Sequence, residues 1–130
     1  MSEALVRALA LLTMLGIPEI PEVRLVDRPP VVTPVTVTAA YVRSDDPAVI
    51  YVVRSSEAYR AALRGHPCAL AAVIAHERIH VWQGRDQAPA YAEQLRVLLA
   101  CGADTGTIAR VAAAAALAGR DVPPQRDTNP

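Results

Sequence analysis

The sequence predicts an α+β domain in which a helix comes first, a small and mostly antiparallel sheet follows, and helices form the rest. Three observations predict this order. Residues 2–15 are an apolar segment with helix start and stop signals, residues 35–53 are rich in β-branched residues, and residues 68–118 contain alanine-rich runs. With 130 residues, the chain is long enough for one domain that buries about two-thirds of its unfolded surface.

The N-terminal helix is expected to run from Ser2 to Leu15. Serine is a favoured N-cap residue, and Gly16 and Pro18 would end the helix. The apolar run inside this helix is too short to span a bilayer, and it lacks the charge pattern and the cleavage site of a signal peptide. We therefore expect a packed helix in a cytoplasmic protein.

The small sheet is expected after a proline-rich segment in which residues 23–26 are the best extended piece. Residues 35–42 are β-branched and alternate in polarity, whereas residues 49–53 are more uniformly apolar. A turn signal at residues 45–47 separates these two runs. They therefore predict an antiparallel hairpin whose second strand is the more central one.

Four helices are expected in the second half of the chain, because capping serines, glycines and prolines divide it into helix-forming runs. The first would start at Ser55 or Ser56 and end at Leu63, and the others would cover residues 68–83, 89–100 and 105–118. We expect residues 1–120 to form the single domain and residues 121–130 to form a disordered tail.

The composition bears on partners and on redox state. Thirteen basic residues balance thirteen acidic ones, so nucleic acid is not an expected partner, and nothing predicts a membrane partner or an oligomeric state. Cys68 and Cys101 lie in apolar, helix-like surroundings, where a free cysteine usually acts as a small buried hydrophobic residue. A disulfide between them is the less favoured alternative.

The motif His76-Glu77-Arg78-Ile79-His80 lies within the expected helix at residues 68–83. Residues four apart share one face of a helix, so the two imidazoles can point at one metal ion. Glu77 is rotated by about 100° from His76, and from there it could reach a water held by that ion. A chance match in a helical scaffold is the alternative, but the apolar flanks favour a metal because a buried charge is costly without a partner.

Glu93 is the expected third ligand. A short loop would fold the motif helix and the next helix into an antiparallel pair, in which His80 and Glu93 each lie about 6 Å from the turn. Asp86 in the connecting loop is the fallback ligand, although a loop or N-cap role suits it better. His66, ahead of the motif helix, is a weaker candidate.

The motif HERIH and the stretch AYAEQ in the following helix resemble the gluzincin branch of zinc metallopeptidases, especially its minimal zincin-like domains. The resemblance covers roughly residues 35–100. It implies a minimal zincin-like fold and a Zn²⁺ ion bound by His76, His80 and Glu93. It also implies that Glu77 is the general base of a zinc-dependent metallopeptidase, which hydrolyses peptide bonds with a zinc-activated water.

The resemblance further implies a binding site for a peptide or protein substrate. In zincins an exposed edge strand pairs with an extended peptide, and here that strand would contain Ala39, Ala40 and Tyr41. No His or Tyr follows Glu93, so the usual oxyanion-stabilising residue is missing. The alternative function is therefore a zinc-binding module with a regulatory or protein-interaction role and little or no protease activity.

Overall fold

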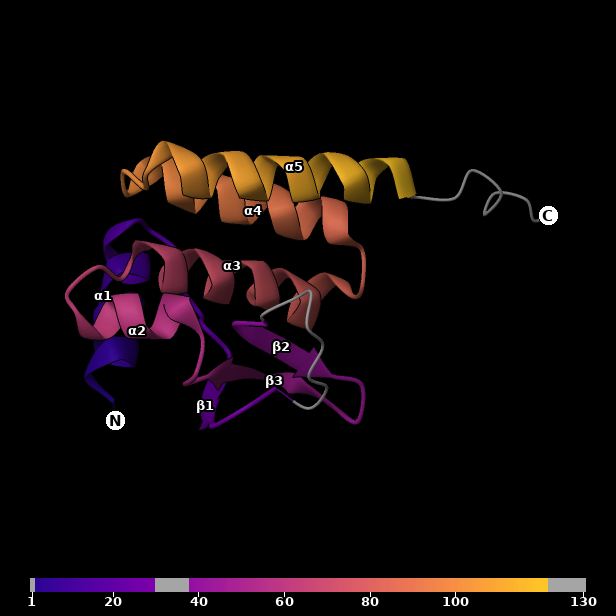
Figure 1. Ribbon diagram of the computed structural model, residues 1–130. Coiled ribbons are helices and arrows are strands. Elements are labelled where there is room, and N and C mark those ends of the chain that lie inside the picture. The colour runs from indigo at the N-terminus through magenta and orange to yellow at the C-terminus, as the bar shows by residue number, and fades with distance from the viewer. Residues whose placement is uncertain (1, 30–37, 122–130) are drawn as a thin grey trace.

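The protein folds as an α+β domain, which confirms the predicted class (Figure 1). The computed structural model describes residues 2–29 and 38–121. Among these residues, no helix is both long enough and apolar enough to cross a lipid bilayer. The elements are α1 (Glu3–Met14), β1 (Glu22–Val26), β2 (Ala40–Arg43), β3 (Asp46–Val53), α2 (Glu57–Leu63), α3 (Cys68–Gln83), α4 (Gln87–Ala100) and α5 (Thr105–Asp121).

The sheet has the strand order β1-β3-β2. Strands β2 and β3 form the predicted antiparallel hairpin, and β3 is the central strand. The expectation of a mostly antiparallel sheet is only half correct, because β1 pairs with β3 in parallel. Residues 30–37, which include the start of the predicted strand at 35–42, lie outside the described residues, as do residues 122–130 of the predicted tail.

Helix α3 occupies the centre of the domain. The sheet lies on one side of it and α4 on the other, with α5 stacked outside α4 (Figure 1). Helices α1 and α2 pack against α3 near its first turns. A helix enclosed in this way needs apolar residues around most of its circumference, and the run Leu70–Ala75 is almost completely buried.

Local signals set the ends of most helices where the sequence predicts them. Ser2 caps α1 by accepting a hydrogen bond from the Leu5 amide, and Ser56 caps α2 through the Tyr59 amide. Helix α4 begins at Gln87, two residues earlier than expected, because Asp86 is its N-cap. This shift brings Gln87 into the helix and against α3.

A disulfide joins Cys68 and Cys101, so the expectation of two free thiols is wrong. Cys68 is the first residue of α3, and Cys101 is the C-cap residue of α4. Because the two helices are antiparallel and of similar length, these ends lie together, with Cα atoms 5.8 Å apart. The disulfide therefore closes the helix pair at the end opposite to the turn at residues 84–86.

We expect the double variant Cys68→Ser/Cys101→Ser to unfold with a free energy lower by about 4 kcal/mol, because the disulfide closes a 33-residue loop in the unfolded chain. Urea unfolding of the oxidised wild type and of the variant would measure the difference. Wild type kept in reductant is the control and should match the variant. Equal stability of oxidised and reduced wild type would contradict this prediction.

Candidate functional site

Three side-chain atoms converge where α3 meets the start of α4. The Nε2 atoms of His76 and His80 are 3.1 Å apart. The Oε1 atom of Gln87 lies 3.0 Å from the first of these nitrogens and 2.9 Å from the second. The four-residue spacing on α3 brings the two imidazoles together. The Gln87 oxygen joins them because α4 starts directly after the turn at residues 84–86.

Hydrogen bonds on the far side of each ring set the protonation of the two imidazoles. The Nδ1–H group of His80 donates to the Gly84 carbonyl at 2.8 Å, and the Nδ1–H group of His76 donates to Oε1 of Gln94 at 2.8 Å. Each Nε2 atom of a neutral ring then carries a lone pair. With the amide oxygens oriented in this way, three lone pairs face one another with no proton between them, which is the donor chemistry of a metal site.

Burial keeps the neighbouring ionisable groups neutral. Glu77 is 9% exposed, and burial raises its pKa to about 8. The pKa of His76 falls to about 4, first because of burial and then because His80 lies beside it. The Glu77 carboxyl is 3.9 Å from Nε2 of His76. In the absence of a cation, Glu77 and His76 are therefore mostly uncharged near pH 7, with the Glu77 carboxyl next to Nε2 of His76.

One face of α4 covers the histidines. Gln87, Tyr91 and Gln94 occupy positions i, i+4 and i+7, which lie along a single stripe of a helix. The Tyr91 ring meets the His76 ring edge to face at 4.6 Å, so its role is packing. Sequence reasoning missed both glutamines, although their seven-residue spacing on a helix antiparallel to the motif helix was a usable signal.

Glu93 points away from the histidines. It is one residue, or about 100°, from Gln94, and its carboxylate pairs with Arg96 at 2.8 Å and with Arg78 at 3.9 Å. The prediction rested on the positions of His80 and Glu93 along the axes of the two helices. The direction of each side chain around the helix axis also decides which residues meet. Height alone places Glu93 near His80, but rotation turns its carboxylate toward Arg78 of α3 and toward Arg96 instead of toward the histidines.

The other candidate ligands also have different roles. Asp86 caps α4 by accepting a hydrogen bond from the Ala88 amide at 3.2 Å. His66 lies in the corner between α2 and α3 and lines a separate cavity. Within residues 2–29 and 38–121, no three His, Cys, Asp or Glu side chains form a group that could hold a metal ion.

The expected identification as a minimal zincin-like domain is therefore wrong, because the ligand group that defined it is not formed in the described part of the chain. Comparisons with family models, with curated proteins and with solved structures find no match. The converging site differs from the expected one in its third member, which is an amide oxygen and not a carboxylate.

The site opens into a cleft of about 650 Å³ between β2 and the turn that joins α3 to α4. Glu77 and His80 lie in its wall, and Ala40 and Tyr41 form the opposite side. Ala39 does not line this cleft, and its carbonyl accepts a hydrogen bond from the Val53 amide. Two of the three residues expected to bind a substrate thus face the converging side chains.

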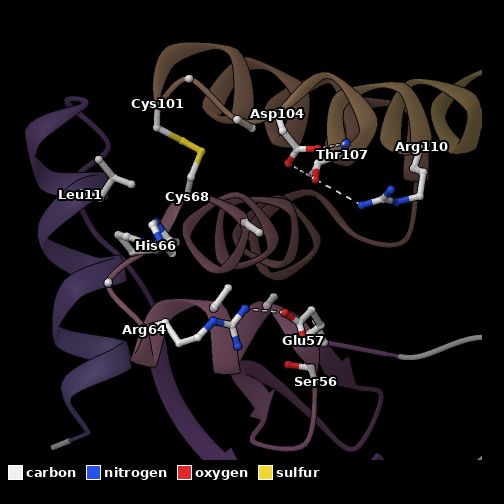
Figure 2. A pocket seen from close by; sticks show the side chains of 18 residues that line it. Leu11, Ser56, Glu57, Arg64, His66, Cys68, Cys101, Asp104, Thr107 and Arg110 are labelled. Carbon is white, nitrogen blue, oxygen red and sulfur yellow. Dashed lines mark hydrogen bonds and ion pairs between the residues drawn. A yellow bond between two sulfur atoms is a disulfide. The ribbon is translucent and has the colours of Figure 1, made fainter.

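A second, larger cavity of about 930 Å³ lies near the first turn of α3 (Figure 2). The disulfide and His66 line one part of it. Glu57 and Arg64 form an ion pair in another part, at 2.7 Å. The start of α5 and Leu11 of α1 contribute further parts of the wall. This cavity shares no lining residue with the cleft beside the histidines.

In metal-free buffer, we expect the free energy of unfolding to fall by about 2 kcal/mol between pH 6.5 and 8. Glu77 has a folded-state pKa of about 8, above its ordinary 4.5, so the folded protein keeps a proton that the unfolded chain has lost, and stability falls as the pH rises. His76, with a pKa lowered from 6.5 to about 4, acts in the opposite direction, but only below about pH 6.5.

Urea unfolding at pH 6.5 and pH 8 would measure this effect in the wild type and in Glu77→Gln. The variant keeps the shape of the side chain but cannot titrate, so its stability should be nearly the same at both pH values. If the wild type and the variant showed the same pH dependence, the Glu77 carboxyl would not be the group responsible.

Proposed function

We propose that the protein is a zinc-dependent hydrolase of peptide bonds, in which His76, His80 and Gln87 hold the Zn²⁺ ion. The single observation that supports this proposal is the convergence of two imidazole nitrogens and one amide oxygen within 2.9–3.1 Å of one another. Ligand atoms about 2.0–2.1 Å from a tetrahedral zinc ion lie about 3.3 Å apart. The three side chains would therefore need to separate by only a few tenths of an ångström.

The surroundings of the imidazoles also suit a metal ion. Both rings already donate their Nδ1–H groups, to Gly84 and to Gln94, so both Nε2 atoms are free to act as ligands. Without a cation, the lone pairs on the three atoms repel one another in a half-buried site. Imidazole nitrogen together with carboxylate oxygen is a common donor combination for zinc, and the Gln87 amide oxygen takes the place of the carboxylate here.

Glu77 is the general base in this proposal. A bound zinc ion would supply a Lewis acid and lower the pKa of a water that it binds. The Glu77 carboxyl lies in the cleft wall beside His76 and can take a proton from the attacking water and pass it to the departing amine. A neighbouring cation favours the carboxylate form, which is the form that this role needs.

The cleft gives this chemistry access to an extended substrate. Strand β2 is the edge of the sheet in the described part of the chain, and it forms the wall opposite Glu77 and His80. A peptide paired with β2 at Ala40 and Tyr41 would run past the two side chains. Recognition through the backbone would accept many sequences.

We expect the wild type to bind one zinc ion, and we expect Gln87→Leu to weaken the affinity at least about tenfold. His80→Ala should lose the ion. Elemental analysis and calorimetric titration with Zn²⁺ would measure both effects. Gln83→Leu is a matched control, since Gln83 is an exposed residue that ends α3. Glu93→Gln should keep the zinc, and its loss in that variant would contradict the assigned ligand set.

We expect Glu77→Gln to retain zinc but to lose peptide hydrolysis by about a hundredfold or more, as is typical when a general base is removed. Mass-spectrometric digestion of a peptide library by the zinc-loaded proteins would measure this. Zinc binding without any cleavage by the wild type would instead favour the alternative, a metal-binding module with an interaction role. Equal cleavage by the wild type and Glu77→Gln would remove Glu77 from its proposed role.

A further inference from the structure

The disulfide lies on the wall of the second cavity and not inside the core. Cys68 and Cys101 are both half-buried, and both line the cavity of about 930 Å³ (Figure 2). Cys68 is twelve residues before His80 on α3, so the disulfide and the histidine site are about 18 Å apart along that helix. A small thiol compound can therefore approach the sulfur atoms without touching the histidine site.

The two sulfur atoms lie at opposite kinds of helix end. Cys68 is the first residue of α3, and its N-cap residue, Pro67, makes no side-chain hydrogen bond to the first turn. The free amides and the positive end of the helix dipole favour a thiolate at this position. Cys101 is the C-cap of α4, where the carbonyl end of the helix disfavours negative charge. The Leu98 carbonyl of α4 also lies 3.9 Å from Sγ of Cys68, so the contrast between the two sulfur atoms rests on the free amides of α3.

Two further residues of the cavity wall flank the cysteines in the sequence. His66 precedes Cys68 by two residues, and Asp104 follows Cys101 by three. All four residues line the same cavity (Figure 2). In thiol–disulfide exchange the sulfur with the more stable thiolate leaves faster, so an incoming thiolate should attack Cys101 and displace Cys68.

We propose that Cys68–Cys101 is a redox-active disulfide, which exchanges with a dithiol that enters this cavity. The thiolate of the dithiol attacks Sγ of Cys101, the Cys68–Cys101 bond breaks, and its electron pair leaves on Sγ of Cys68. The second thiol of the dithiol then attacks the mixed disulfide and releases Cys101. The dithiol loses two electrons and becomes a disulfide, while its two protons and two electrons end on the two cysteines.

Reduction would release the C-terminal end of α4 from the start of α3. Helix α4 would then be held by the turn at residues 84–86 and by its buried apolar residues, among them Val97 and Leu98. Helix α5 packs on α4 and starts four residues after Cys101, so it would share this release. The exchange therefore controls how firmly the outer helix layer is attached.

The first test uses the oxidised wild-type protein at pH 7 without denaturant. Dithiothreitol is the dithiol probe, and mass spectrometry after iodoacetamide labelling counts the free thiols. We expect both cysteines to become labelled at a rate proportional to the dithiothreitol concentration and unchanged by low urea concentrations. A rate that rises with urea in step with global unfolding would overturn the proposal, because the disulfide would then react only in the unfolded chain.

The second test compares the two sulfur atoms directly. Cys101→Ser leaves Cys68 as the only thiol, and Cys68→Ser leaves Cys101, so each variant is the matched control of the other. We expect Cys68 to react with iodoacetamide about threefold faster or more at pH 7, and we expect this advantage to disappear near pH 10, where both thiols are ionised. Equal rates at pH 7, or a faster Cys101, would overturn the assigned direction of exchange.

A third measurement needs no variant. Reduced glutathione, a monothiol, should form a mixed disulfide on Cys101 of the wild type and leave Cys68 free. Peptide mapping after iodoacetamide labelling would locate both products. Glutathione found on Cys68 would contradict the proposal, and this result does not depend on whether the single-cysteine variants fold.

Discussion

The enclosure of α3 on nearly every side is the constraint on which the rest of this structure depends. The sheet, α1, α2 and α4 all pack against it. Three consecutive polar residues, His76, Glu77 and Arg78, are therefore carried into the interior. A buried polar group is costly unless it finds a partner, so the elements around α3 must supply matching side chains. Most of these partner side chains come from α4.

Arg78 contacts the face of α4 that carries Glu93. Its guanidinium group pairs with Glu93, stacks on the Trp82 ring at 3.9 Å, and donates to the Pro18 carbonyl at 3.2 Å. The Glu93 carboxylate lies on the side of α4 that faces Arg78, where it also pairs with Arg96. The face about 100° away, which carries Gln94 and Gln87, then meets the histidines. The ion pair and the histidine site thus use neighbouring faces of the same helix.

The sequence correctly predicted structural features that depend on neighbouring residues, such as the ends of helices. Ser56 fixed the start of α2 and Gly84 the end of α3, and both can be read from a few neighbouring residues. It could not predict features that depend on distant contacts. The parallel pairing of β1 needs knowledge of the whole sheet, and the pairing of Cys68 with Cys101 needs the matched lengths of two antiparallel helices. The third member of the site also escaped, because the rotation of α4 about its axis depends on its packing contacts with α3.

The histidine site lies at one end of the α3–α4 pair and the disulfide lies at the other end. This separation limits how strongly the histidine site and the disulfide can influence each other. Gln87 is three residues from Gly84, so the short turn holds it near the histidines even when the distant end of α4 is free. Cys101, in contrast, is fourteen residues further along the chain and depends on side-chain packing and on the disulfide. Loss of the disulfide should therefore loosen α4 mainly at its C-terminal end beside Cys101 and leave the converging atoms in place. The histidine site and the disulfide lie on the same two helices, but different contacts hold each of them in place.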